Sequence, residues 1–385
     1  MDDINENDKN NTNKTMIKKI NQKFPIPKKE ILEIKKYVPG KSVASGSSRS
    51  IKLSSNETPL GTSSKAKEII KQVSDYKLPI YPDGDSYSLR EAIAKHNNIE
   101  INRVVCGNGS DELIMILTKI FAGIGDEILY SQYGFLMYPI AAKVVGATPI
   151  SAPEFNLKTN IKNLISHVTK NTKVCFIANP NNPTGTYLSK SELIDLRNRL
   201  PKECLLVIDS AYSEYVSNED YDNGISIARG RKDIVVTRTF SKIYGLASLR
   251  LGWAYCPEEI VDFVNSVRAP FNVNSLAQLA GKAALEDNVF INHAKLHNDK
   301  WKPWLENELR NLGIKIQPGV ANFCLLEFNK KGHHTAINCF KYLLDNGIIV
   351  RGVSEYGLPS HLRVTVGTEE DNHEFIRCMK SFFNQ

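Results

Sequence analysis

The middle of this 385-residue chain alternates short apolar runs with segments of helical periodicity. Parallel strands need a crossover connection, usually a helix, so the alternation predicts βαβ units and a mainly parallel sheet with helices on both faces. The runs expected to be strands are 102–106, 126–130, 147–151, 173–178, 204–208, 233–237 and 250–255. The helices expected between them are 86–97, 110–122, 134–145, 189–200 and 257–267. The pattern therefore predicts an α/β fold built on a seven-stranded sheet.

The pattern changes after residue 273. The elements expected there are a helical region at 275–312, a strand at 322–328, a helix at 335–346, strands at 348–351 and 361–366, and a final helix at 368–383. This order predicts a second, smaller α+β lobe. The predicted division is a disordered polar tail at 1–24, an N-terminal arm with part of the small domain at 25–72, a large domain at 73–272 and a small domain at 273–385.

Composition narrows the possible partners. No apolar run approaches the roughly 18 residues that span a bilayer, and the polar N-terminus lacks a signal-peptide core, so no membrane partner is expected. Seven cysteines without a C-x-x-C pair indicate reduced thiols and a cytoplasmic protein. The net charge of +7 suits phosphorylated small molecules, and no nucleic-acid-binding motif accompanies it. Neither His293 with His297 nor His333 with His334 has a third ligand, so no metal site is predicted.

Residues 239–253, TFSKIYGLASLRLGW, place Lys242 after Thr239 and Ser241 and eight residues before Arg250. A lysine that is desolvated and close to a positive charge favours the neutral amine, which is the form that makes imines. Hydroxyls and a forked guanidinium suit a phosphate. An imine-forming lysine beside a phosphate site is what pyridoxal 5′-phosphate (PLP) requires, so we predict this cofactor. A buried structural lysine is the alternative.

Two further segments follow predicted strands, at the edge where open α/β sheets bind ligands. GNGSDE at 107–112 opens a helix, where glycines allow close backbone approach and free N–H groups attract an anion. We expect a phosphate cradle there. In SQYGF at 131–135, Tyr133 is a candidate for stacking on a flat ring. A packing role is the alternative for this tyrosine.

Two more segments complete the set. NPNNPTG at 179–185 is a stiff turn after a strand, in which Asn182 offers an amide donor for a phenolate oxygen. DSAYSEY at 209–215 begins with Asp209, which ends a buried apolar run and needs a partner there. A protonated pyridine nitrogen is such a partner, because the carboxylate keeps the ring charged and able to accept electrons. Tyr212 is expected within reach of the ring oxygen.

In this order the segments resemble those of the fold type I PLP-dependent aminotransferases, over the chain from about residue 30 to the C-terminus. Within that group the chain most resembles the histidinol-phosphate aminotransferases. The stretches that carry the resemblance, besides NPNNPTG, are YVPGK at 37–41, KLSSNETPLG at 52–61, YPDG at 81–84 and LRVTVGT at 362–368. One departure is Ser210, because that family commonly has glutamate after the aspartate, as DEAY.

The resemblance implies a role for each candidate in cofactor binding. Lys242 would carry PLP, Asp209 would pair with the pyridine nitrogen, Asn182 and Tyr212 would bind the ring oxygen O3′, and Tyr133 would stack on the ring. The residues implied around the phosphate are Gly109, Ser110, Asp111, Thr239, Ser241 and Arg250. Tyr81 would reach the phosphate from the neighbouring subunit, which implies a homodimer.

The resemblance also implies the substrate site. Arg363 would bind the α-carboxylate of an amino acid, Arg351 would help to hold the phosphate of histidinol phosphate, and Tyr37 and Asn56 would line the same pocket. Bidentate recognition by arginine suits both anions. For Arg351, a surface position on a strand is the alternative.

The implied reaction converts L-histidinol phosphate and 2-oxoglutarate to imidazole acetol phosphate and L-glutamate, a step of histidine biosynthesis. An aromatic amino acid aminotransferase and a threonine-phosphate decarboxylase are alternatives on the same scaffold. A non-enzymatic transcription regulator is disfavoured, because about 30 residues before the matching region are too few for a DNA-binding module.

Overall fold

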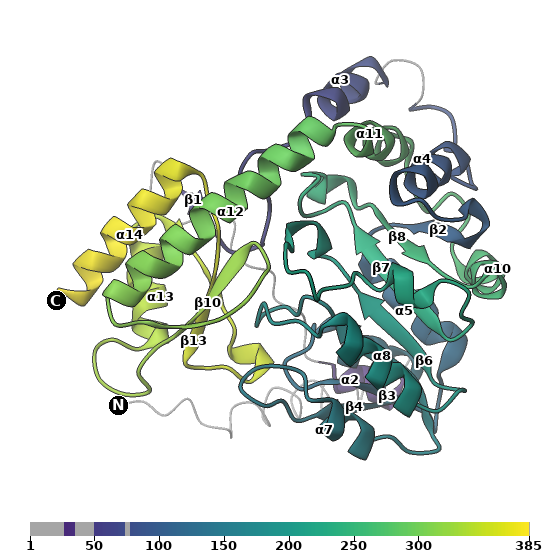
Figure 1. Ribbon diagram of the computed structural model, residues 1–385, viewed down its shortest axis with the longest axis horizontal. Helices are drawn as coiled ribbons and strands as arrows, with labels where there is room; N and C mark the ends of the chain where they lie inside the picture. The colour runs from purple at the N-terminus through teal and green to yellow at the C-terminus, as the bar shows by residue number, and fades with distance from the viewer. Residues whose placement is uncertain (1–26, 35–49, 74–77, 385) are drawn as a thin grey trace, which may run out of the picture.

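The computed structural model describes residues 27–34, 50–73 and 78–384, arranged as a large and a small lobe (Figure 1). The expected tail at 1–24 and Tyr37 lie outside the described residues. In the described part of the chain, no helix is both long enough and apolar enough to cross a membrane.

The large lobe is built on the predicted seven-stranded sheet. Its strands are β2 (Val104–Gly107), β3 (Glu127–Ser131), β4 (Thr148–Ala152), β5 (Thr172–Ala178), β6 (Leu205–Asp209), β7 (Ile234–Thr239) and β8 (Gly252–Tyr255). They lie in the order β2-β8-β7-β6-β5-β3-β4, and every pair is parallel except those that β8 makes with β2 and β7. The predicted α/β class and mainly parallel sheet are therefore confirmed.

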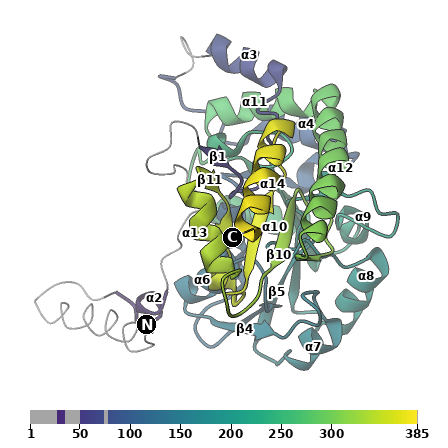
Figure 2. The same cartoon turned by 90° about the vertical axis from the view of Figure 1, so that its left-hand side faces the viewer.

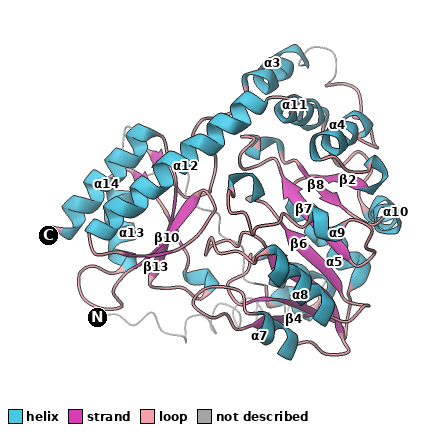
Figure 3. Cartoon of the chain, viewed as in Figure 1, coloured by secondary structure: helices cyan, strands magenta, loops and turns pink. Residues whose placement is uncertain are grey.

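Helices cover both faces of this sheet (Figure 3). They are α4 (Tyr87–Asn97), α5 (Ser110–Phe121), α6 (Met137–Val145), α7 (Ile161–Ser166), α8 (Lys190–Arg199), α9 (Ile225–Ala228) and α10 (Glu258–Val267). The five expected helices are confirmed, whereas α7 and α9 were not predicted because so few residues carry little periodicity. Alternate residues of a strand pack on opposite faces of the sheet. In β6, Leu206 and Ile208 pack with α4 and α8, whereas Leu205 and Val207 pack with α5, α6 and α10.

The small lobe combines the C-terminal part of the chain with a segment from its beginning. Its four-stranded antiparallel sheet has the order β12 (Arg351–Gly352), β13 (His361–Thr365), β10 (Phe323–Glu327) and β9 (Lys315–Gln317). Beside it, β1 (Ile51–Lys52) pairs in parallel with β11 (Ile348–Ile349). The helices are α12 (Asn288–Asn311), α13 (Ala336–Asp345) and α14 (Glu369–Phe383), with α12 running along α14 (Figure 2).

The remaining short elements of the described chain, in either lobe, are α2 (Lys29–Leu32) and the 3-10 helices η1 (Ile101–Arg103), η2 (Ser213–Tyr215), η3 (Ala247–Leu249) and η4 (Ser354–Tyr356).

The helical region expected at 275–312 is two helices, α11 (Ser275–Leu285) and α12. The break falls at Asp287, whose side chain accepts a hydrogen bond from the Phe290 amide and caps α12. Helix α11 packs against α3 (Ser64–Val73) and α4, and its alanines share the apolar core of the large lobe. This packing favours a boundary between the lobes at the break, rather than at 272/273 as the sequence suggested.

Candidate active site

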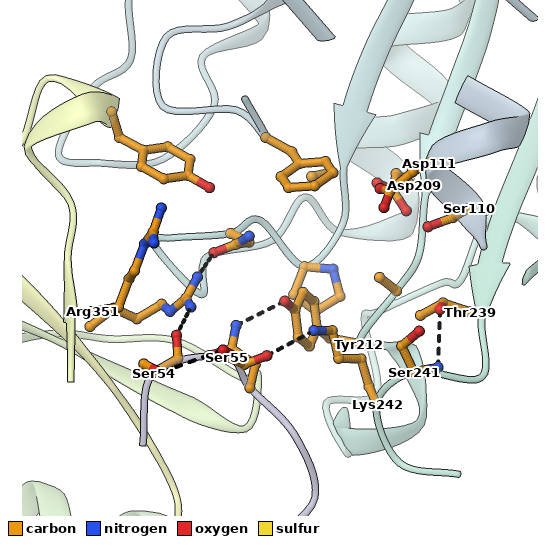
Figure 4. Close-up of a pocket in the computed structure, with 18 of the residues that line it drawn as sticks. Ser54, Ser55, Ser110, Asp111, Asp209, Tyr212, Thr239, Ser241, Lys242 and Arg351 are labelled. Atoms are coloured by element: carbon orange, nitrogen blue, oxygen red, sulfur yellow. Dashed lines mark hydrogen bonds between the residues drawn. The ribbon is translucent and has the colours of Figure 1, made fainter. Parts of the chain in front are cut away.

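A pocket lies between the lobes, where β5, β6 and β7 end (Figure 4). Its walls come from the large lobe, from β12 and β13 of the small lobe, and from Ser54 and Ser55 just after β1. The structure brings twelve of the predicted site residues to this one pocket: Asn56, Ser110, Asp111, Asn182, Asp209, Tyr212, Thr239, Ser241, Lys242, Arg250, Arg351 and Arg363. Strand ends separated by long stretches of sequence meet here, because the parallel strands all point to the same edge.

Lys242 stands in the loop after β7 and points into the pocket (Figure 4). Its Nζ donates to the Ser55 carbonyl at 3.1 Å and lies 5.5 Å from the centre of the Tyr212 ring. The loop is held by a close backbone approach at Gly245, which has φ +69° and where a Cβ would lie 2.1 Å from the Gly61 carbonyl oxygen. A tightly packed loop therefore presents a primary amine to the pocket.

Asp209 ends β6 and is only 5% exposed. The Tyr138 hydroxyl donates to its Oδ2 at 3.0 Å, and the Thr237 hydroxyl donates to its Oδ1 at 3.1 Å. Burial raises the pKa of Asp209 to about 6, while the two hydrogen bonds act in the opposite direction. A buried carboxylate that faces a pocket would be stabilised by a cationic group bound there.

Hydroxyls and a guanidinium gather beside the first turn of α5. Arg250 donates to Ser241 Oγ at 3.2 Å and to Asp111 Oδ2 at 3.2 Å, and the Ser241 amide donates to Thr239 Oγ1 at 3.1 Å. Helix α5 begins at Ser110, so its free N–H groups and dipole add to the attraction for an anion. These residues form a cradle of hydroxyl, guanidinium and helix N–H donors, which are the groups that bind a phosphate.

Glycines allow the parts of this cradle to approach one another. A Cβ on Gly252 in β8 would lie 2.4 Å from the Ser110 nitrogen and 2.5 Å from the Gly109 carbonyl carbon. Gly109 does not line the pocket itself, but it has φ +86°, and a Cβ there would lie 2.6 Å from Nη2 of Arg250. Gly109 therefore leaves room for the guanidinium that faces the cradle.

Two arginines approach the pocket from the small lobe. Arg363 in β13 donates to the Ser54 carbonyl at 2.7 Å and to Oδ1 of Asn182, and so joins the small lobe to the loop after β5. Arg351 in β12 lies opposite Arg363 in register and forms an ion pair with Glu355 at 3.3 Å. The pocket therefore has two guanidinium groups beyond the one in the phosphate cradle.

Asn56 connects Thr365 in β13 of the small lobe to Tyr212 of the large lobe. Its Nδ2 donates to the Tyr212 hydroxyl at 2.9 Å, and its Oδ1 accepts from the Thr365 hydroxyl at 3.1 Å. Asn56 is 1% exposed, so these hydrogen bonds fix the direction of the Tyr212 phenol.

Tyr133 does not line the pocket. Its ring packs in an apolar cluster between the lobes with Val353, Tyr356 and Leu358, and Phe135, two residues further on, lines the pocket instead. Residues 132–136 form a turn before α6, closed by the Gly134 amide on the Ser131 carbonyl at 2.7 Å. This turn decides which aromatic ring faces inwards, so the geometry favours Phe135 over Tyr133 as the stacking residue.

Tyr81 lies away from the pocket of its own chain. It is 78% exposed and stacks on Phe271, with ring centres 4.7 Å apart, in a separate hollow on the surface.

Four residues in or beside the pocket were not predicted from the sequence: Phe135, Ser55, Tyr356 and Tyr138. Phe135 and Tyr138 stand within or beside a helical apolar pattern, so nothing in the sequence distinguishes them from core residues.

Comparisons with known proteins agree with this geometry. A sequence model described as "Aminotransferase class I and II" matches residues 48–378. The histidinol-phosphate aminotransferase of Paramagnetospirillum magneticum is 48% identical over 358 residues, which cover 93% of this chain and 98% of that protein. The histidinol-phosphate aminotransferase of Maricaulis maris is 45% identical over 356 residues, or 92% and 98% of the two chains. The crystal structure of histidinol-phosphate aminotransferase from Sinorhizobium meliloti, in complex with PLP, superposes with a TM-score of 0.85 at 20% identity, covering 94% of this chain and 99% of that chain.

Proposed function

The chain belongs to the class I and II aminotransferases, and from that premise we propose that it transfers the amino group of L-histidinol phosphate to 2-oxoglutarate with PLP as cofactor. The products are imidazole acetol phosphate and L-glutamate, and the reaction serves histidine biosynthesis. The observation that carries the proposal is one pocket that combines Lys242, Asp209 and a phosphate cradle with two further arginines. The identity of 48% to a histidinol-phosphate aminotransferase supports the choice of substrate.

The residues of the pocket fit PLP. Asp209 offers a buried carboxylate to the pyridine nitrogen, and the cradle around Arg250 and Ser241 offers hydroxyl, guanidinium and helix N–H donors to the phosphate. Lys242 offers the amine that would hold the cofactor through its aldehyde carbon. When bound, PLP supplies an electron sink that stabilises negative charge on the substrate Cα.

Each residue near the ring has a task that its position supports. With PLP bound, Lys242 Nζ would move the proton from the substrate Cα, first as general base and then as general acid. In this proposal Tyr212, which accepts a hydrogen bond from Asn56, and Asn182 would hold the phenolic oxygen O3′, and both line the pocket. Phe135 takes the stacking role that the sequence suggested for Tyr133.

In this proposal Arg363 and Arg351 bind different anionic groups of the substrates. Arg363, beside Asn182, binds the α-carboxylate of glutamate or 2-oxoglutarate, and Arg351 binds the phosphate of histidinol phosphate. We propose Asn56 as a further substrate contact; Tyr37, which the sequence also suggested for this role, lies outside the described residues. An Arg351→Gln variant should lose about 10- to 100-fold in kcat/KM for histidinol phosphate, because charged hydrogen bonds contribute about 1.5–3 kcal/mol. Its kcat/KM for unphosphorylated histidinol should change little, and Arg377→Gln, 76% exposed on α14, is the control.

One comparison of substrates tests the whole assignment. The PLP-loaded protein is mixed with histidinol phosphate, phenylalanine and threonine phosphate in turn, and glutamate formation from 2-oxoglutarate is measured. We expect rapid transfer with histidinol phosphate. A clear preference for phenylalanine would assign the chain to the aromatic aminotransferases, and release of carbon dioxide from threonine phosphate would assign it to the decarboxylases.

We also propose that the protein is a homodimer in which Tyr81 reaches the phosphate of the partner subunit. Leu78, Ile80 and Tyr81 are 65%, 66% and 78% exposed in the single chain, which is unusual for a cluster of large apolar side chains and suits an interface. Mixing the inactive variants Lys242→Ala and Tyr81→Ala should restore activity, because a mixed dimer has one site with both side chains intact. Failure of the mixture to regain activity, with mixed dimers verified by mass, would contradict this arrangement.

The cytoplasm is the location that we propose. All seven cysteines are free and buried, which accords with a compartment that keeps thiols reduced. Fractionation of the cells that make the protein tests this directly.

A further inference from the structure

We propose that Tyr138 is a positioning residue whose hydroxyl, together with that of Thr237, fixes the Asp209 carboxylate in the orientation that receives the ring nitrogen of the cofactor. This inference rests on the proposed function, since it concerns PLP. The geometry that carries it is a pair of hydroxyl donors, one on each carboxylate oxygen, at 3.0 Å from Tyr138 to Oδ2 and 3.1 Å from Thr237 to Oδ1.

With both donors in place, the Asp209 carboxylate can still accept further hydrogen bonds. Each carboxylate oxygen has two lone pairs, so one hydroxyl on each oxygen leaves an acceptor position on each for a group in the pocket. Asp209 is itself part of the pocket wall, as Figure 4 shows. Burial raises the pKa of the Tyr138 phenol well above its ordinary value, and the nearby carboxylate raises it further, so the phenol stays protonated and donates.

The fold holds the two donors on two different elements, a strand and a helix. Thr237 in β7 is the register partner of Asp209 in β6, so the sheet itself sets their distance. Tyr138 comes from the first turn of α6 and is fully buried. Its ring stacks on Phe176 of β5, with centres 4.8 Å apart and planes at 7°. This stacking fixes the ring and with it the direction of the hydroxyl. Donors fixed before the ligand arrives need no reorganisation when it binds.

Tyr138 also supports the ring-facing side of the pocket. Its ring contacts Phe135 edge to face, with centres 5.9 Å apart and planes at 89°. One buried side chain thus touches both the residue proposed to stack on the cofactor and the carboxylate proposed to pair with it. The Tyr138→Phe substitution would keep the ring contacts and lose only the hydrogen bond, so the two contributions can be separated.

Tyr130 provides a matched control. It is the neighbouring tyrosine, with its ring centre 6.4 Å from that of Tyr138, and its hydroxyl bonds to Ser151 rather than to Asp209. Tyr130→Phe therefore removes a hydroxyl from the same region without touching the carboxylate. The other ionisable groups that act on Asp209 are Asp111 and Lys242, which both variants retain.

The test measures how tightly the apo forms of wild type, Tyr138→Phe and Tyr130→Phe bind PLP and 1-deaza-PLP, an analogue with C–H in place of the ring nitrogen. We expect Tyr138→Phe to bind PLP about tenfold more weakly than wild type, since a hydrogen bond to a charged group is lost. Its affinity for 1-deaza-PLP should match that of wild type, which also shows that the variant is folded. The acid limb of PLP binding should move to higher pH, because loss of a donor raises the pKa of Asp209. Tyr130→Phe should behave as wild type throughout.

Three results would overturn the inference. Equal weakening for PLP and 1-deaza-PLP would make Tyr138 a packing residue only. A Tyr138→Phe variant with wild-type affinity and wild-type pH dependence would remove the role of the hydroxyl. Either result leaves the proposed function intact if wild type binds PLP, whereas wild type that fails to bind PLP would overturn both proposals. Thr237→Val, which removes the second donor, should show the same selective loss for PLP.

Discussion

Replacing Asp209 with asparagine tests the electrostatics of the pocket without any cofactor. Burial raises the pKa of this carboxyl from the ordinary 3.8 to about 6 in the folded protein. The folded state therefore holds this proton more tightly than the unfolded state does. The resulting stability is fully present below pH 3.8 and is lost as the pH rises through about 6.

The size of the effect follows from the two pKa values. The complete difference of about two pH units corresponds to about 3 kcal/mol. Between about pH 5 and about pH 8, the titration of Asp209 should lower the free energy of unfolding of the apo protein by about 1.4 kcal/mol. Asparagine does not titrate, so the Asp209→Asn variant lacks this contribution, and its altered hydrogen bonds add only an offset that is independent of pH.

The assay is urea unfolding of the apo proteins at fixed concentration at the two pH values, followed by tryptophan fluorescence, for which Trp253 in β8 is a buried reporter. The difference in stability between variant and wild type should shift by about 1.4 kcal/mol in favour of the variant from about pH 5 to about pH 8. Asp262→Asn, at an exposed position on α10, is the control and should show no such shift. A difference that stays constant with pH would refute the argument that burial raises the pKa of Asp209.

The Asp209→Asn variant should also lose transaminase activity, and retained activity would refute the pairing of Asp209 with the cofactor.

Three further predictions concern the lysine, the cradle and a helix cap. Lys242→Ala should abolish amino transfer and prevent borohydride from fixing PLP to the chain; undiminished turnover would contradict its role. Gly252→Ala should destabilise the fold by about 1–3 kcal/mol and weaken PLP binding, because its Cβ would lie 2.4 Å from the Ser110 nitrogen. Gly123→Ala, with no atom within 4 Å of its Cβ, is the control, and equal effects of the two would refute the close-contact argument. Ser189→Ala should cost about 1 kcal/mol in urea unfolding, because Ser189 forms a capping box with Glu192 at the start of α8.

Most elements of the large lobe could be predicted because their signals are local. A strand such as β6 is a short apolar run that is buried on both faces, and a helix such as α5 shows its periodicity over twelve residues. The helical break at Asp287 was missed because the apolar pattern continues across it. The pairing of β1 with β11 was also missed, since two residues of strand carry no detectable pattern and the partner is almost 300 residues away.

The residues of the site also differ in whether a local sequence signal predicts them. Lys242, Asp209 and Asn182 could be predicted because each follows a strand that the sequence marks, and parallel strands bring their ends together wherever they stand in the chain. The choice between Tyr133 and Phe135 depends on a tight turn and on the start of α6 at Met137, which no local pattern reports.

By itself, the sequence determined the α/β class, the cofactor and the residues at the ends of the strands. Only the tertiary structure decided that Phe135 faces the pocket, that Tyr138 donates to Asp209, and that Arg363 meets Asn182 across the lobes. The physical reason is that periodicity and turn chemistry act over a few residues, whereas the direction of a buried side chain is set by neighbours that packing brings from distant parts of the chain.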